Sequence, residues 1–332
     1  MPAVRTLSPK ENLLRHYRHE KPDFLPVVGE ALKSLFPIHA YYERPEGSGG
    51  TVDCFGVQYV FEAATGASIP DINAPRVITD ITKWEEQLKI PDPDTFDWEG
   101  GAKIDKVDEL PRDTMLIQVL LQAGLWERTH ALMGMSEAYV ALVTEPDAMM
   151  AMISALAEYK LKIFDKIIKY YKVDIMRQHD DYGAQNAMQM SPEMWRKFIK
   201  PHTAKFVEFC HKQGVFFEQH SCGFIEPIVP DFAEVGVDSW NGMHINDVPK
   251  LKKITGESLN YYMSLNVPDY YVMDKVGKLD EAWLREDVHK MVSASAEGGN
   301  YFCTFGALRD PDWWGTPIIA EEVEKIRVQL TY

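Results

Sequence analysis

Residues 215–223 read Val-Phe-Phe-Glu-Gln-His-Ser-Cys-Gly, an apolar start that runs into a polar end. The apolar run is short, and Gly214 precedes it at the end of a helical stretch, which together indicate a buried β-strand. Alternate residues of a strand face the same side, so Glu218, His220 and Cys222 share one face. We therefore predict a strand whose last residues present an imidazole and a thiol together.

Strands of this kind alternate with amphipathic helical stretches along the chain, which favours βα units and a parallel sheet. The other predicted strands are 23–29, 115–121, 173–178, 237–241, 259–265 and 300–305. The predicted helices are 144–172, one that opens at Ser191-Pro192, 224–235, 247–254, 279–296 and 317–330. The alternation predicts a (β/α)8 TIM barrel, formed as a single domain by residues 1–332.

Seven strands are readable in this pattern, and we expect the eighth within residues 50–112. The Gly-rich turn at 47–50 and the run 51–62 are interpreted as a hairpin, so we expect a helical and hairpin elaboration at the N-terminal side of the barrel.

Polar side chains follow the C-terminal ends of the predicted strands, and in a TIM barrel that rim carries the active site. We assign Glu30, His179 and Asp181 to substrate binding, and Asp180 and Glu218 to acid–base chemistry. The alternative for residues 179–181 is a structural cluster that caps the following loop.

One imidazole and two thiolates on neighbouring strands would make a three-ligand zinc site with one exchangeable position, as catalytic zinc ions have. His220 and Cys222 supply the first two ligands, and Cys303 in the strand-like run 300–305 supplies the third. Glu218 is a fourth ligand, a partner of a ligand or a proton donor. The alternative is a hydrogen-bonded core histidine beside an inert buried thiol.

Composition limits the class of protein. The chain has 332 residues, a net charge of −15 and four cysteines. This charge argues against a nucleic-acid partner, and four cysteines in a chain this long do not form a disulfide framework. We find no apolar run of 18 residues and no apolar N-terminal segment, so we expect a cytoplasmic protein with no membrane partner, as a monomer or homodimer.

Several stretches, in this order and spacing, resemble the uroporphyrinogen decarboxylase superfamily over nearly the whole chain. They are residues 12–18, 180–185 with 191–193, 236–238, 251–256 and 298–301. True decarboxylases of the superfamily carry an N-terminal Arg-rich motif for the substrate's carboxylates, whereas residues 28–32 here offer Glu30. The His-x-Cys pattern with a distant Cys is similar to that of the zinc- and corrinoid-dependent methyltransferases, such as methylcobamide:coenzyme M methyltransferase.

Residues 53–57, Asp-Cys-Phe-Gly-Val, look closer to the bacterial O-demethylase methyltransferases. One departure is that Cys303 lies within the last predicted strand, whereas the family's second Cys is expected near that strand's end. The resemblance implies a zinc-dependent enzyme that moves a methyl group from an aryl methyl ether to the cobalt of a corrinoid (cobalamin) held by a partner protein.

Three alternatives stay open at this point. The same ligands would serve a methylcobamide:thiol methyltransferase of the coenzyme M type. A decarboxylase of an acidic pyrrole could use Asp180 or Asp181 to protonate a ring carbon, and a binding protein without catalysis would hold a ligand and turn nothing over.

Overall fold

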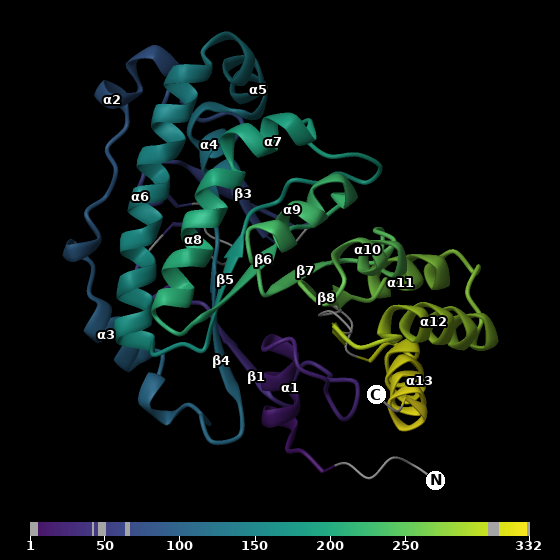
Figure 1. Ribbon diagram of the computed structural model, residues 1–332. Coiled ribbons are helices and arrows are strands. Elements are labelled where there is room, and N and C mark those ends of the chain that lie inside the picture. The colour runs from purple at the N-terminus through teal and green to yellow at the C-terminus, as the bar shows by residue number, and fades with distance from the viewer. Residues whose placement is uncertain (1–5, 42, 46–50, 64–66, 305–311, 331–332) are drawn as a thin grey trace.

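A curled parallel β-sheet forms the centre of the molecule, and helices cover its outer face (Figure 1). The computed structural model describes residues 6–41, 43–45, 51–63, 67–304 and 312–330. The strands follow the order β1-β4-β5-β6-β7-β8-β9, and every neighbouring pair is parallel. Their bounds are β1 Leu32–Leu35, β4 Leu116–Leu121, β5 Ile175–His179, β6 Phe216–His220, β7 Ser239–Met243, β8 Asn260–Ser264 and β9 Tyr301–Thr304.

The segment that leads into β1 contacts both edges of this sheet and so curls it into the predicted TIM barrel. Val27 forms a parallel bridge with Cys303 of β9, while β1 pairs with β4. Between the two contacts the chain turns at Gly29, whose φ of 101° favours glycine. The first strand therefore lies later than predicted, because residues 23–29 hold this edge contact and turn, and regular pairing starts only at Leu32.

No eighth parallel strand occurs in the described part of residues 50–112, and that prediction is wrong. The segment instead forms an antiparallel hairpin of β2 (Tyr59–Glu62) and β3 (Ala67–Pro70), separate from the barrel sheet. Val60 and Phe61 of β2 are exposed, which a strand of a parallel barrel does not allow. The predicted hairpin is thus present, although its expected turn at 47–50 lies outside the described residues.

Helices follow most strands, as βα units require. Figure 1 shows α6 and α8 along the left of the curled sheet and α10 to α13 along its right. The helix bounds are α1 Pro9–Tyr17, α2 Trp84–Gln87, α3 Trp98–Ile104, α4 Leu125–Met133, α5 Met135–Thr144, α6 Pro146–Tyr171, α7 Pro192–Phe198, α8 Lys200–Lys212, α9 Val229–Glu234, α10 Val248–Thr255, α11 Val267–Lys275, α12 Glu281–Ala296 and α13 Gly315–Gln329.

The helix predicted to open at Ser191-Pro192 does so, because the Ser191 side chain accepts a hydrogen bond from the Met194 N–H at 3.2 Å. It is interrupted at Ile199, and Pro201 in the first turn of α8 lacks the N–H that would continue the helical pattern. Helix α11 was not predicted.

Helix α1 closes the N-terminal end of the barrel. Leu13 and Tyr17 pack among residues near the starts of five strands. These strand residues are Leu32, Leu116, Ile175, Tyr262 and Phe302. With this end filled, access to the barrel interior is from the C-terminal rim, where β5 and β6 end at His179 and His220.

Within the described ranges, no single helix is long and apolar enough to cross a membrane. Helices α5 and α6 meet that length and hydropathy only when they are taken together, and they are bent by 119° relative to each other.

Candidate active site at the C-terminal rim of the barrel

The ends of β5 and β6 bring three side chains with metal-binding atoms together. His179 lies opposite His220 in the parallel register, and the two rings stack with centroids 4.3 Å apart. Asp181 follows directly after β5. One potential ligand atom from each of His179, Asp181 and His220 lies within 4.8 Å of the others, and all three residues are partly exposed.

Cys222 joins this group from the loop after β6. The His220 Nε2 lies 3.2 Å from the Cys222 Sγ and 3.5 Å from an Asp181 carboxylate oxygen. The same oxygen accepts the Cys222 backbone N–H at 2.6 Å. The loops after β5 and β6 meet backbone to backbone at Gly183 and Gly223, where a Cβ on either glycine would lie within 2.6 Å of the other loop. This close approach fixes Cys222 beside Asp181. The structure thus brings His220 and Cys222 together, as alternation along the strand predicted, and adds Asp181, which the sequence analysis assigned to substrate binding.

Asn241 of β7 sets the tautomer of His220. The Asn241 side-chain NH₂ donates to the Tyr262 carbonyl at 3.0 Å, so its Oδ1 faces His220 and accepts from Nδ1 at 2.6 Å. This network assigns the proton to Nδ1 and leaves a lone pair on Nε2. Burial, with His179 nearby, holds the pKa of His220 well below its usual value, so the ring is neutral. A neutral imidazole whose unprotonated nitrogen is held in one orientation can coordinate a metal ion.

The Cys222 thiol is protonated in the absence of a cation. Burial and the neighbouring Asp181 carboxylate raise its pKa well above the usual range. A bound divalent cation reverses this preference, because it deprotonates a coordinating thiol.

Glu127 at the start of α4 holds His179. The His179 Nδ1 lies 2.9 Å from Glu127 Oε2. Burial lowers the pKa of His179, but Glu127 and Asp181 outweigh it and raise the pKa to about 9. Burial acts on Glu127 in the opposite sense, yet His179 brings its pKa down to about 2. At neutral pH the two therefore form an ion pair. Sequence reasoning missed Glu127, whose signal was the charged and aromatic loop that follows the strand at 115–121.

Asp180 is turned away from the cluster and caps α4. Its carboxylate accepts the backbone N–H groups of Trp126 at 3.0 Å and Glu127 at 2.9 Å, and the Tyr182 hydroxyl at 2.9 Å. A Cβ at Gly124 would lie 2.2 Å from this side chain, so the contact requires glycine. Burial and the Glu127 charge raise the pKa of Asp180 to about 7. The position matches the structural alternative considered for residues 179–181.

Glu218 lies one layer deeper in the barrel and has no accessible surface. Its carboxylate accepts the Tyr17 hydroxyl at 2.6 Å and the Gln118 amide at 3.0 Å, and it pairs with Arg177. Both oxygens are thus engaged by the barrel interior.

Cys303 and Glu30 lie away from the cluster. Neighbouring residues of a strand face opposite sides, and Phe302 points into the barrel against α1, so Cys303 points outward into the main core. Burial raises the pKa of the Cys303 thiol to about 12. The Glu30 carboxylate makes a two-point ion pair with Arg327 of α13, at 2.9 and 2.7 Å. The expected third thiolate and the expected Glu30 contact are therefore not brought to His220.

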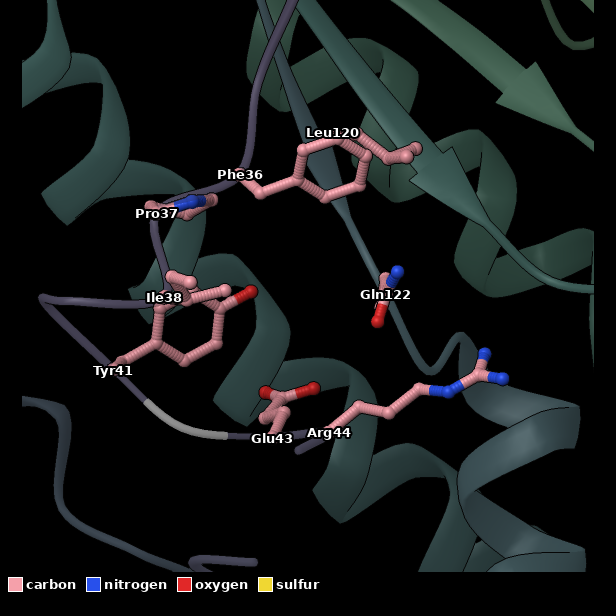
Figure 2. A pocket seen from close by; sticks show the side chains of 8 residues that line it. All are labelled: Phe36, Pro37, Ile38, Tyr41, Glu43, Arg44, Leu120 and Gln122. Carbon is pink, nitrogen blue, oxygen red and sulfur yellow. The ribbon is translucent and has the colours of Figure 1, made fainter. Parts of the chain in front are cut away.

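Two cavities are lined by Arg44, and the larger one also has Glu127, the partner of His179, in its wall. The smaller, of about 20 Å³, lies where β1 and β4 end, and Figure 2 shows Phe36, Tyr41 and Gln122 around it. The larger, of about 170 Å³, lies between the hairpin and α4. Its lining comprises Arg44, Tyr59, Ile69, Pro70, Ala123, Glu127, His130 and Ala131.

Comparison with known proteins gives one family and a similar fold. A family model described as uroporphyrinogen decarboxylase (URO-D) matches residues 55–278. A solved structure of a methyltransferase from Methanosarcina mazei is similar over 97% of this chain and 99% of that chain, with a TM-score of 0.63 and 14% sequence identity.

A second solved structure is a glycosylated endo-beta-1,4-xylanase of glycoside hydrolase family 10 from Gloeophyllum trabeum. It covers 71% of this chain and 82% of that chain, with a TM-score of 0.43 and 11% identity, a likeness too loose to inform the chemistry. No curated protein matches the sequence.

Proposed function

The chain belongs to the uroporphyrinogen decarboxylase family, and we propose that it is a zinc-dependent methyltransferase. In this proposal it moves a methyl group from an aryl methyl ether to the cobalt of a corrinoid held by a separate protein. The methyltransferase from Methanosarcina mazei shares the fold over nearly the whole length of both chains, which supports this choice within the family.

One observation carries the proposal. The His220 Nε2, with its lone pair fixed by Asn241, lies 3.2 Å from the Cys222 Sγ. Zinc bonds of about 2.0 Å to nitrogen and about 2.3 Å to sulfur at a tetrahedral angle place the two ligand atoms about 3.5 Å apart. The pair therefore fits a shared zinc after a small adjustment, and Asp181 is the neighbouring third donor.

In this assignment Asp181 replaces Cys303, which the sequence analysis had assigned as the third ligand. A set of one nitrogen, one sulfur and one carboxylate oxygen suits zinc and leaves a fourth position for substrate. A zinc ion bound there would supply Lewis acidity toward the ether oxygen.

His179 is the proton donor in this proposal, in place of Glu218 and Asp180, whose carboxylates are engaged elsewhere. Its ion pair with Glu127 keeps both ring nitrogens protonated at neutral pH. When the methyl carbon passes to reduced cobalt, the electron pair of the broken C–O bond stays on oxygen, which takes the His179 proton and leaves as a phenol.

The test is to incubate the purified chain with methoxybenzenes and reduced cobalamin and to follow methylcobalamin absorbance and free phenol together. We expect both products in equal amounts, and their loss in Cys222→Ser but not in the matched variant Cys210→Ser, since Cys210 is buried in the core. Methylation of thiols by methylcobalamin without ether cleavage would assign the reverse, coenzyme M-type reaction. Release of carbon dioxide from a porphyrinogen without either methyl transfer would overturn the proposal.

A further inference from the structure

We propose that the cavity between the β2–β3 hairpin and α4 binds a single-ring aromatic carboxylate, with Arg44 as the partner of the carboxylate group. This inference deepens the proposed function by naming the substrate class, and it rests on that function only for the methoxy group that the substrate would carry.

The cavity has the size of one aromatic ring. Its volume is about 170 Å³, and an apolar protein cavity of about 150 Å³ is known to hold benzene. Most of its wall is apolar or aromatic, from Tyr59, Ile69 and Pro70 of the hairpin and Ala123 and Ala131 beside and within α4. A flat, apolar body fits this lining.

Arg44 brings a positive charge to the cavity wall. Its Nε donates to the Ser68 carbonyl at 3.0 Å, which anchors the side chain to the hairpin. Among the residues that the structure describes, no carboxylate lies within 4.0 Å of its guanidinium. Figure 2 shows the Arg44 side chain extended past Glu43 and away from Tyr41.

The two nearby carboxylates are already paired. Glu43 is buried in a network with Lys160 and Arg128. Glu127 pairs with His179 at 2.9 Å. An incoming carboxylate therefore meets a guanidinium that has no carboxylate partner among the described residues, and a planar guanidinium can bind a carboxylate through two parallel hydrogen bonds.

His130 adds a neutral polar group to the same wall. Within the described ranges its imidazole has no side-chain hydrogen-bond partner, although its ring packs edge-on against Trp126. Burial lowers the pKa of His130 to about 4, so it adds no charge. It is available to a hydroxyl or ether oxygen on the ring, whereas the anion belongs to Arg44.

One residue of the cavity wall also connects to the cluster. Glu127 lies in its wall and holds His179, whose ring stacks on His220. A ring in the cavity therefore lies against Glu127, whose partner His179 contacts the cluster.

Binding of ligands without a methyl group tests this site apart from methyl transfer. Titration by fluorine NMR would compare 4-fluorobenzoate with the neutral 4-fluorobenzamide. We expect the benzoate to bind at least about tenfold more tightly, and Arg44→Gln to abolish this difference. Arg44→Lys should keep part of it. The matched control Arg76→Gln should leave it unchanged, because Arg76 bonds only to loop carbonyls of Asp71 and Ile72 in the described structure.

A second variant, Ala131→Leu, fills the cavity while leaving Arg44 in place, and it should exclude both probes. Equal binding of benzoate and benzamide to the unmodified chain, a preference for benzoate that survives Arg44→Gln, or binding of either probe that survives Ala131→Leu would overturn the proposal. Cleavage of neutral methoxybenzenes by a chain that binds no benzoate would leave the methyltransferase assignment standing and this one refuted. Benzoate binding without any methyl transfer would do the reverse.

Discussion

Strands β5 and β6 carry two successive polar layers into the barrel, and the two layers have opposite character. In the lower layer Arg177 lies opposite Glu218, and in the upper layer His179 lies opposite His220. The lower pair is enclosed by the barrel and by Tyr17 of α1. The upper pair lies at the rim with Asp181 and Cys222, partly open to solvent.

The difference lies in how the lone pairs are used. Glu218 accepts from Tyr17, Gln118 and Arg177, and the Arg177 guanidinium lies 4.6 Å from the Tyr262 ring centroid. The His220 Nε2 and the Cys222 Sγ have each other and Asp181 as neighbours, a set that a cation would join. The lower layer thus stabilises the barrel interior, whereas the upper layer, two residues further along the same strands, keeps lone pairs that can bind a ligand.

The largest expected effect comes from opening the lower layer. Glu218→Ala leaves the Arg177 guanidinium buried without its carboxylate, and we expect a loss of about 3–5 kcal/mol in the free energy of unfolding, measured with denaturant. The exposed Glu85 provides a matched control, and Glu85→Gln should change stability by about 0.5 kcal/mol or less. If Glu218→Ala lowered turnover but not stability, Glu218 would act in catalysis, and the two layers would not differ in role.

In the upper layer we expect the largest effect on rate. His179→Gln keeps a hydrogen-bonding side chain beside Glu127 but removes the proton, so turnover should fall about 10²-fold or more. Its stability loss should be smaller than that of Glu218→Ala. Kinetics and denaturant unfolding on the same preparation measure both, and near-normal turnover would remove His179 from proton transfer.

The His179–Glu127 pair also predicts how stability depends on pH in the metal-free protein. The raised pKa of His179 adds stability that is complete below about pH 6.5 and is lost as the pH rises through about 9. The lowered pKa of Glu127 adds stability that is present above about pH 4.5 and is lost as the pH falls toward 2. The free energy of unfolding, measured across this range, should be highest between about pH 4.5 and about pH 6.5. In Glu127→Gln it should depend less on pH on both sides of this maximum. An unchanged profile in that variant contradicts the ion pair.

The smallest effect tests one donor of the lower layer. Tyr17→Phe removes the hydroxyl that donates to Glu218 at 2.6 Å but keeps the ring between Phe216 and Phe302. We expect a loss of about 1–3 kcal/mol in the free energy of unfolding, with zinc content and turnover retained. A loss of metal in this variant would mean that the two layers are not separate.

The sequence was a good guide to the barrel because strand and helix periods are local. The runs around 175–179, 216–220 and 239–243 carry enough apolar residues to be recognised as strands, and alternation placed His220 and Cys222 together. The sequence did not reveal how the barrel closes. The contact of Val27 with Cys303 is a single bridge, and Val27 belongs to no regular strand.

The hydrogen-bond and ion-pair partners of the polar residues could not be predicted from the sequence. Glu218 and His220 share a face, but only the packing of Tyr17 against the barrel shows that Glu218 is enclosed. Cys303 is a suitable residue type for a zinc ligand, but its side chain points away from the barrel interior. The orientation of its neighbour Phe302 shows this. Glu127 lies 52 residues from His179, and nothing local marks their pairing.

Zinc content of purified protein, measured by elemental analysis, tests the central claim most directly. We predict about one zinc per chain, lost in His220→Ala and Cys222→Ser and retained in Cys303→Ser, Cys210→Ser and Glu218→Gln. Loss of metal in Cys303→Ser would return that thiol to the ligand set. Full retention of metal in both His220→Ala and Cys222→Ser would contradict the account, because the rim layer would then hold no zinc.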